Sequence, residues 1–169
     1  KNLNLKVKYR ESFRPFAPSI LREDLENWFE LSNDSPYMQL VCSINKDKII
    51  TMTEEQEKLF GIEKLNINRS TIPAVTHVDY SARIQTVHSQ TNKRYHALIT
   101  KFKEKTNCPI LVNTSFNVRG EPIVNSPTDA YKCFMGTGID FLIIENYVIK
   151  KDSQKKENIN DYKNQYKLD

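Results

Sequence analysis

The sequence predicts an α/β fold in which helices flank an open, twisted, mixed β-sheet. Two observations support this class: short β-rich runs alternate along the chain with segments of helical periodicity, and turn-forming residues separate them. This alternation favours a layered sheet over a helical bundle or a β-sandwich. With 169 residues the chain is long enough for one domain. We expect that domain over residues 1–150 and a polar, frayed or surface-docked tail over residues 151–169.

Four segments predict helices. Leu21, Leu25, Trp28 and Phe29 form one apolar stripe at i, i+4, i+7 and i+8. Three further segments carry helix-start signals, namely a Thr followed by Gln three residues on, an Asn cap, and a Ser-Pro cap. The predicted helices cover residues 21–29, 53–59, 92–107 and 126–136, and the stretch after residue 61 is expected to be an irregular loop.

The predicted strands are short, apolar and rich in β-branched residues. We expect the run at residues 110–113 to be an interior strand, because it is continuously apolar. Residues 72–79 and 83–88 are separated by a three-residue turn, which suggests a hairpin. The basic, proline-containing stretch 8–19 is expected to be extended. The remaining predicted strands cover residues 38–44, 141–144 and 147–149.

Composition limits the possible classes of function. Hydrophobic residues make up 38% of the chain, yet no apolar run approaches the roughly 20 residues that cross a bilayer. No leader pattern is visible, so we expect a soluble, cytoplasmic protein. The three cysteines lie far apart in apolar stretches, which predicts buried thiols and no metal site. A net charge of +4 is mild for a nucleic-acid-binding protein, and a bound phosphate explains it as well.

The first stretch that could carry chemistry is basic and aromatic, at residues 8–19. In a strand, Lys8, Arg10, Ser12 and Arg14 would share one face because side chains alternate with a period of two. Like charges held together repel, so an anion would stabilise such a cluster, and Arg offers phosphate a bidentate fork. The alternative is a solvated basic edge strand, which spacing alone favours.

The second stretch follows the predicted strand at 110–113. Asn113, Ser115, Asn117 and Arg119 lead into a turn at Gly120. Ligands of open α/β sheets collect beyond the carboxyl ends of strands, where hydroxyls, amides and an Arg can hold phosphate oxygens. Alternatively, these side chains merely satisfy backbone groups of a turn.

The third stretch contains His77 and Asp79 in a His-x-Asp arrangement, followed by Arg83. Two ligands are too few for a metal without help from elsewhere. Arg83 is the more informative residue, because it is a further cation that could face an anion.

Three motifs together resemble the carboxyl-terminal, YrdC-like domain of the O-carbamoyltransferases, a family that includes antibiotic-tailoring and nodulation-factor enzymes. The motifs are R-E-S-F-R-P-F-A-P-S at residues 10–19, I-P-A-V-T-H-V-D-Y-S-A-R-I-Q-T-V at 72–87, and N-T-S-F-N-V-R-G-E-P-I-V-N-S-P-T-D-A at 113–130. Tyr80 occupies a position where this family usually has Gly. Such a domain implies a YrdC-like sheet, ATP with Mg²⁺ and carbamoyl phosphate as ligands, and a carbamoyl-adenylate intermediate.

The resemblance also implies roles for individual residues and a partner. Arg83 and Ser115 would be catalytic, and the ligands would contact a set comprising Lys8, Arg14, Arg83, Asn113, Ser115, Asn117 and Arg119. An amino-terminal actin/hexokinase-like domain of the same polypeptide would transfer the carbamoyl group to an acceptor hydroxyl, and any iron or other transition metal would belong there. The alternatives are a YrdC-like RNA-binding module and a non-catalytic relic. The sequence does not identify the acceptor.

Overall fold

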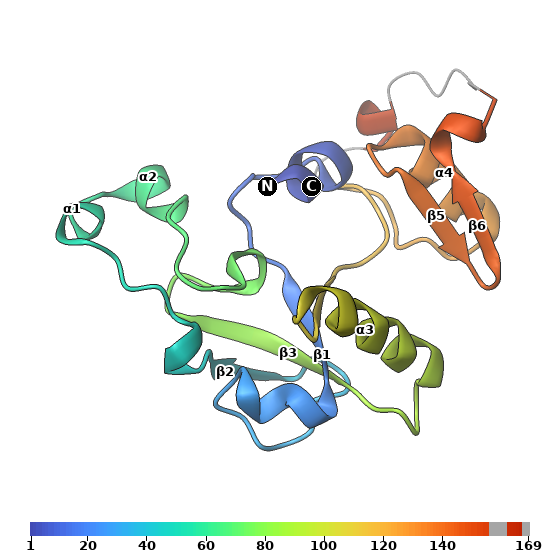
Figure 1. Ribbon diagram of the computed structural model, residues 1–169. Helices are drawn as coiled ribbons and strands as arrows, with labels where there is room; N and C mark the ends of the chain where they lie inside the picture. The colour runs from blue at the N-terminus through green and yellow to red at the C-terminus, as the bar shows by residue number, and fades with distance from the viewer. Residues whose placement is uncertain (156–161, 167–169) are drawn as a thin grey trace. The chain divides into compact units, whose positions relative to one another are not determined.

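The computed structural model describes residues 1–155 and 162–166, which form two compact units (Figure 1). Unit 1 comprises Lys1–Arg14 and Ser115–Asp169, and unit 2 comprises Pro15–Thr114. Compact units of this size need not fold independently, so the single domain of residues 1–150 stays a prediction. None of the described helices is long and apolar enough to cross a membrane.

Unit 2 is built on a four-stranded mixed sheet in the order β2-β3-β1-β4. β1 runs parallel to β3 and antiparallel to β4, and β2 runs antiparallel to β3. The mixed sheet and its flanking helices confirm the predicted α/β class. The strands of this sheet are β1 (Ala17–Leu21), β2 (Leu40–Ser43), β3 (Ser81–Val87) and β4 (Ile110–Asn113).

The core of unit 2 lies between the sheet and helix α3 (Lys93–Thr106). Ile99 of α3 is fully buried and clusters with Leu21 of β1 and Val87 of β3. The predicted Asn92 cap is confirmed, because its side chain accepts from the Tyr95 amide. The helix ends beside Asn107, as predicted, and Asn107 adopts the left-handed conformation. The capping box of Thr53 is also confirmed, at α1 (Glu54–Glu57).

Several predictions for unit 2 are wrong. The apolar stripe at 21–29 forms the end of β1 and a 3₁₀-helix over Arg22–Asn27, because Leu21 pairs with Val87 of β3. Residues 72–79 contain a 3₁₀-turn at Pro73–Val75 instead of a hairpin strand. β4 lies at an edge of the sheet and not in its interior. The expected loop after residue 61 contains α2 (Gly61–Leu65).

The turn before β3 keeps a conformation that glycine adopts most easily. Tyr80 has a φ of 63°, in the left-handed region. The adjoining turn is closed by a hydrogen bond from the Tyr80 amide to the His77 carbonyl, with 3.2 Å between N and O. The Gly that the family resemblance leads us to expect at this position would adopt the same geometry without strain.

Unit 1 packs helix α4 (Pro127–Gly136) against a two-stranded antiparallel hairpin of β5 (Phe141–Ile144) and β6 (Tyr147–Lys150). The Ser126 side chain accepts from the Asp129 amide, and Pro127 is the first helical residue, as predicted. Phe134 of α4 and Leu142 of β5 are buried together in the core. The hairpin is a separate sheet.

The amino-terminal part of unit 1 is not the predicted extended strand. Asn4–Lys8 forms a π-helical turn that ends at Tyr9, whose φ of 49° is left-handed. The Tyr9 hydroxyl donates to the Gly136 carbonyl, with 3.0 Å between the oxygens. This turn reverses the chain before β1, so residues 8–14 approach the loop after Ser115 instead of continuing a strand.

The predicted tail falls partly on residues 156–161 and 167–169, which lie outside the described residues. Its described part contains 3₁₀-turns at Lys151–Ser153 and Tyr162–Asn164. Tyr162 is only 4% exposed and clusters with Val118 and Cys133. A β-carbon at Gly136 would lie 2.2 Å from the Tyr162 ring, so this docking requires a residue without one.

We expect Gly136→Ala to destabilise the fold by about 1 to 3 kcal/mol, because the added methyl group overlaps the Tyr162 ring. Urea denaturation of the 169-residue chain measures this change. In the Tyr162→Gly background the same substitution should cost little, because both the ring and the β-carbon, which would lie 2.7 Å from the added methyl group, are gone. An equal loss in both backgrounds would contradict the assignment of the clash to Tyr162.

Candidate functional site

A cationic cavity of about 210 Å³ lies within unit 1. Two short segments that are far apart in the sequence line it, the turn after Lys8 and the loop after Ser115. Four of its lining residues are cations, and the others are polar or small: Lys8, Arg10, Arg14, Ser115, Asn117, Val118, Arg119 and Gly120. Among the described residues that line it, none carries a carboxylate.

The Lys8 ammonium joins the two segments. Its Nζ donates to the carbonyls of Ser115 at 2.8 Å and Asn117 at 2.7 Å, and to Oδ1 of Asn117 at 2.6 Å. A further contact of 3.2 Å reaches Oγ of Ser115. Lys8 is only 5% exposed, so these oxygens solvate its ammonium group in place of water. The contacts fix the loop around the lysine.

Burial, together with the nearby Arg10 charge, lowers the pKa of Lys8 to about 8. Both causes disfavour the charged ammonium. An anion in the cavity would favour that charged form and raise the pKa again. Lys8 is therefore a cation whose charge depends on pH close to neutrality.

Asn4 shapes the turn that carries the arginines. Its Nδ2 donates to the carbonyl of Arg14 at 2.7 Å and to that of Ser12 at 3.3 Å. Its Oδ1 accepts from Nε of Arg10 at 2.7 Å. Asn4 is 1% exposed, so these hydrogen bonds satisfy a fully buried amide. The amide thereby holds the backbone of residues 10–14 beside the cavity.

Glu11 lies between two arginines of the cavity. Its carboxylate oxygens are 4.0 Å from Nη1 of Arg14 and 3.7 Å from Nη1 of Arg119. All three side chains are about half exposed, so water screens these pairs and each contributes little to stability. A phosphate can exchange with such a carboxylate at low cost.

The loop after Ser115 is closed by Glu121. The Val118 amide donates to Oε2 of Glu121 at 2.7 Å, and Nδ2 of Asn117 donates to the Glu121 carbonyl at 2.7 Å. Gly120 has a φ of 78°, which a residue with a β-carbon rarely adopts. The Ser115 hydroxyl donates to Oδ1 of Asn117 at 2.6 Å. The loop is therefore ordered by its own polar side chains.

Five of the seven predicted site residues belong to this cavity: Lys8, Arg14, Ser115, Asn117 and Arg119. The other two belong to unit 2. Arg83 is exposed on β3, opposite Val41 of β2. Asn113 ends β4, and its Nδ2 donates to Oε1 of Gln85 at 2.6 Å. The structure of unit 2 by itself gives no reason to place an anion beside Arg83 or Asn113.

The polar turn at His77 has a structural explanation within unit 2. The Ser81 hydroxyl donates to Oδ1 of Asp79 at 2.7 Å, and Nδ1 of His77 lies 3.1 Å from the same hydroxyl oxygen. These hydrogen bonds lower the pKa of Asp79. The His-x-Asp pair thus closes the turn before β3 through a serine.

Sequence reasoning missed three residues that shape the cavity: Asn4, Glu11 and Glu121. Glu11 lies within the basic stretch of residues 8–19, so charge balance could have identified it. Glu121 follows a glycine turn, where a carboxylate often accepts backbone amides. No sequence signal marks Asn4, because its role depends on a π-helical turn that sequence patterns do not reveal.

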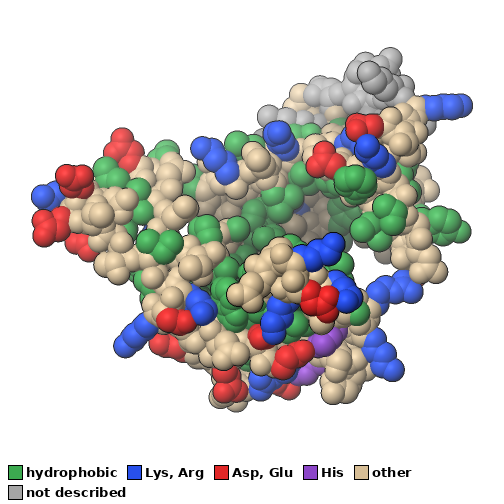
Figure 2. Space-filling model, viewed as in Figure 1, with side chains coloured by type: hydrophobic (Ala, Val, Ile, Leu, Met, Phe, Trp, Pro, Cys, Tyr) green, Lys and Arg blue, Asp and Glu red, His purple; other side chains and the backbone are tan. Residues whose placement is uncertain are grey.

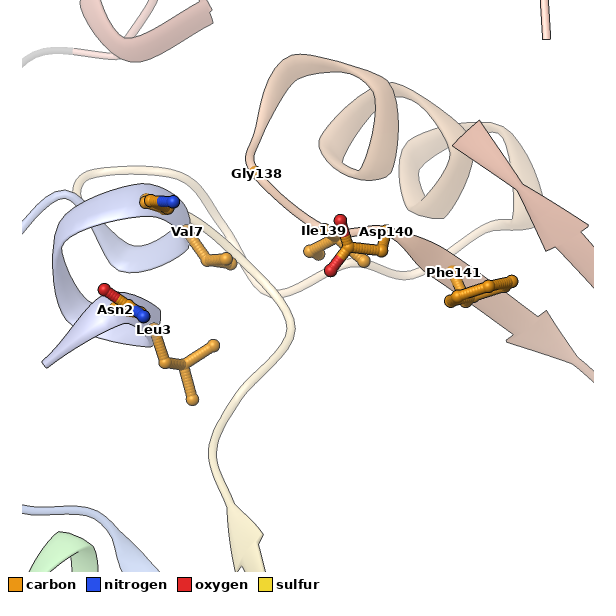
Figure 3. A pocket seen from close by; sticks show the side chains of 8 residues that line it. Asn2, Leu3, Val7, Gly138, Ile139, Asp140 and Phe141 are labelled. Atoms are coloured by element: carbon orange, nitrogen blue, oxygen red, sulfur yellow. The ribbon is translucent and has the colours of Figure 1, made fainter. Parts of the chain in front are cut away.

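A larger cavity of about 470 Å³ in the same unit is a weaker candidate for anion binding. Leu3 and Val7 lie along one wall, and Ile139, Asp140 and Phe141 lie along the other (Figure 3). Lys6 is its one cation among the described lining residues, and Asp140 offsets that charge. An anion would therefore gain little there compared with the cavity of Lys8.

The geometry of the cationic cavity suits a phosphate or another small polyoxyanion. Arg guanidinium groups offer paired donors to phosphate, and the buried ammonium adds a fixed positive charge. Polar groups preorganised in this way stabilise charge that develops during phosphoryl or adenylyl transfer. These features define an α/β protein with a cationic cavity beside an ordered polar loop.

The comparison with protein families places the chain more closely. Residues 1–151 match the family described as Carbamoyltransferase C-terminus, and the chain belongs to that family. The resemblance predicted from the three sequence motifs is thereby confirmed.

Several relatives are much longer than this chain. An uncharacterized protein of Synechocystis sp. is 56% identical over 168 residues, which cover 99% of this chain and 27% of the relative. Nodulation protein NolO of Bradyrhizobium diazoefficiens is 39% identical over a region that covers 88% of this chain and 24% of that protein. The 3'-hydroxymethylcephem-O-carbamoyltransferase of Amycolatopsis lactamdurans is 30% identical over 82% of this chain and 22% of its own. The chain thus spans about a quarter of each.

We expect sulfate binding to the 169-residue chain to weaken roughly tenfold between pH 7 and pH 9.5. Lys8 has a pKa of about 8 without ligand and loses its charge as the pH rises through that value, whereas sulfate keeps its charge. Calorimetry at several pH values measures the change. Lys8→Arg, whose charge does not titrate there, should remove most of the pH dependence. The same pH dependence in Lys8→Arg would assign the effect to another group.

Proposed function

We propose that the chain is the carboxyl-terminal domain of an O-carbamoyltransferase, in which it binds carbamoyl phosphate and ATP and forms carbamoyl-adenylate. The observation that supports this most is the cavity of unit 1, where Lys8, Arg14 and Arg119 gather around one ordered polar loop. Its size and charge fit a phosphoryl group, and its residues coincide with those that the family motifs assign to the ligand.

The proposed chemistry needs charge neutralisation more than a protein nucleophile. Water attacks the phosphorus of carbamoyl phosphate, the bond between that phosphorus and the carbamoyl oxygen breaks, and phosphate and carbamate result. A carbamate oxygen then attacks the α-phosphorus of ATP. The bond between that phosphorus and the pyrophosphate oxygen then breaks, and pyrophosphate leaves. The cations of the cavity would offset charge that builds on the phosphoryl oxygens, and the Ser115 loop would orient them.

Magnesium would enter with the nucleotide. The cavity offers cations, amides and a hydroxyl, and its described lining residues include no carboxylate that would hold the ion directly. This donor set fits a magnesium ion that is carried by ATP phosphates and keeps several waters. When bound, the ion would neutralise phosphate oxygens, and the residues of this chain would bind and orient the phosphoryl group.

The second half of the reaction would belong to an amino-terminal domain of the same polypeptide. The relatives named above are about four times longer than the part this chain matches, which supports a further domain in the family. Two of the similar proteins are named as carbamoyltransferases of a hydroxymethylcephem. Transfer of the carbamoyl group to an acceptor hydroxyl in that half is part of the proposal.

The distribution of charge supports an anion pocket more than an RNA-binding surface. An RNA-binding protein spreads Lys and Arg over a broad face and adds aromatics for stacking. On the face seen in Figure 2, Lys and Arg side chains are interspersed with Asp and Glu. Four cations of unit 1, Lys8, Arg10, Arg14 and Arg119, instead line one cavity of about 210 Å³.

We expect Arg14→Ala to weaken binding of carbamoyl phosphate to the 169-residue chain about tenfold, because the site loses one guanidinium donor. Arg14 is partly exposed, so the loss should be smaller than for a fully buried pair. Isothermal titration calorimetry measures the affinities. Arg94→Ala, which removes an exposed arginine of α3, is the matched control and should bind normally. Equal affinities for wild type and Arg14→Ala would refute the assignment of Arg14.

We expect a full-length protein that carries this domain to release pyrophosphate from ATP, magnesium and carbamoyl phosphate before any acceptor is added. Adenylation supplies the leaving group that transfer requires, so it comes first. A coupled pyrophosphate assay measures the release, which Ser115→Ala should reduce strongly and Ser153→Ala should leave unchanged. Arg83→Ala tests the catalytic role that the family motifs assign to Arg83. Release that requires acceptor would contradict the proposed order.

A further inference from the structure

We propose that Tyr162 and Tyr166 are positioning residues that hold the anion-binding loop of residues 115–121 in its active conformation through Glu121. The proposal rests on the proposed function, because it concerns the affinity of the same cavity. Both tyrosines lie beyond residues 1–151, the part that matches the carbamoyltransferase family. The segment would thus add to the site from outside the region that the family model matches.

The two tyrosine hydroxyls converge on one carboxylate oxygen. The Tyr162 hydroxyl donates to Oε1 of Glu121, and the Tyr166 hydroxyl donates to the same atom at 3.2 Å. The Tyr166 hydroxyl also lies 3.4 Å from that of Tyr162, and the two rings meet edge to face with centroids 5.6 Å apart. This arrangement fixes both the position and the rotation of the Glu121 carboxylate.

The other side of Glu121 holds the loop. Its Oε2 accepts from the Val118 amide, and its carbonyl accepts from Nδ2 of Asn117. Asn117 in turn offers its carbonyl and Oδ1 to the Lys8 ammonium. A continuous series of hydrogen bonds therefore runs from the tyrosine hydroxyls through Glu121 and Asn117 to the buried cation.

Burial makes this series sensitive to the loss of one donor. Glu121 is 8% exposed and Val118 is 1% exposed, so water reaches the carboxylate poorly. A buried carboxylate that loses a hydrogen-bond donor is destabilised unless another positive partner replaces that donor. The Glu121 charge interacts electrostatically with Lys8. Once a tyrosine hydroxyl is lost, the Glu121 carboxylate would compete with the loop carbonyls for the Lys8 ammonium. Burial also raises the pKa of Tyr162, which keeps its hydroxyl a donor.

The docking site for Tyr162 is specific. Gly136 approaches the ring so closely that a β-carbon there would overlap it, and Cys133 and Val118 complete the apolar surround. Burial raises the pKa of Cys133 to about 12, so its thiol stays neutral beside the tyrosine. The ring is anchored by packing, and its hydroxyl is left to orient Glu121. The two contributions can be separated by a substitution that removes the hydroxyl alone.

The experiment compares wild type with the double variant Tyr162→Phe/Tyr166→Phe in the 169-residue chain. The phenyl rings preserve the packing, so the variant should fold. Tyr147→Phe removes an exposed hydroxyl of β6 and is the matched control. Sulfate binding is measured by calorimetry, and exchange of the Val118 amide hydrogen is followed by NMR. We expect at least about fivefold weaker sulfate binding and faster Val118 exchange in the double variant, with wild-type behaviour in Tyr147→Phe.

The two readouts separate this proposal from the proposed function. Unchanged sulfate affinity in the double variant, with binding intact in wild type, would refute the positioning role. If wild type failed to bind sulfate, the anion site itself would be refuted. In that case the Val118 exchange rate would decide the rest: faster exchange would support loop ordering by the tyrosines, and an unchanged rate would overturn it.

Discussion

The buried ammonium of Lys8 is the interaction on which the cationic cavity depends. Removing a charge from water is costly unless oxygen atoms replace the lost solvent. Here the carbonyls of Ser115 and Asn117 provide that replacement, 107 and 109 residues along the chain from the lysine. The same contacts that make the charge tolerable also fix the loop. Stability of unit 1 and order of its anion site are therefore consequences of one arrangement.

Around this cation the protein places arginines that are more exposed. Arg14 and Arg119 share the carboxylate of Glu11, which moderates their repulsion while leaving their guanidinium groups accessible. A buried cation gives the site a fixed field, and exposed cations can adjust to an incoming ligand. This division of roles is consistent with the phosphoryl binding that we propose for the cavity.

Membership in the carbamoyltransferase family gives the cavity a chemical context. The family motifs assign seven residues to the ligand, and five of them line a single cavity within unit 1. Two independent lines of reasoning, charge chemistry and family resemblance, thus converge on Lys8, Arg14 and the Ser115 loop. The carboxyl-terminal tyrosines reach the same loop from its other side, through Glu121.

The sequence by itself determined the elements whose signals are local. Neighbouring residues predicted the Asn92 cap, the Ser126-Pro127 helix start and the strands at residues 141–144 and 147–149, and the structure has all of them. The sequence also marked Lys8 and Arg14 as candidate cations of the site, although spacing alone favoured a solvated edge strand and the family resemblance was needed to assign them. Tertiary structure decided what depends on distant partners. The apolar stripe at 21–29 begins with the end of β1, because Leu21 pairs with Val87. Lys8 contacts Asn117 because it ends a π-helical turn and does not lie in an extended strand. Periodicity reports which side of a segment is buried, but the choice between helix and strand rests with partners far along the chain.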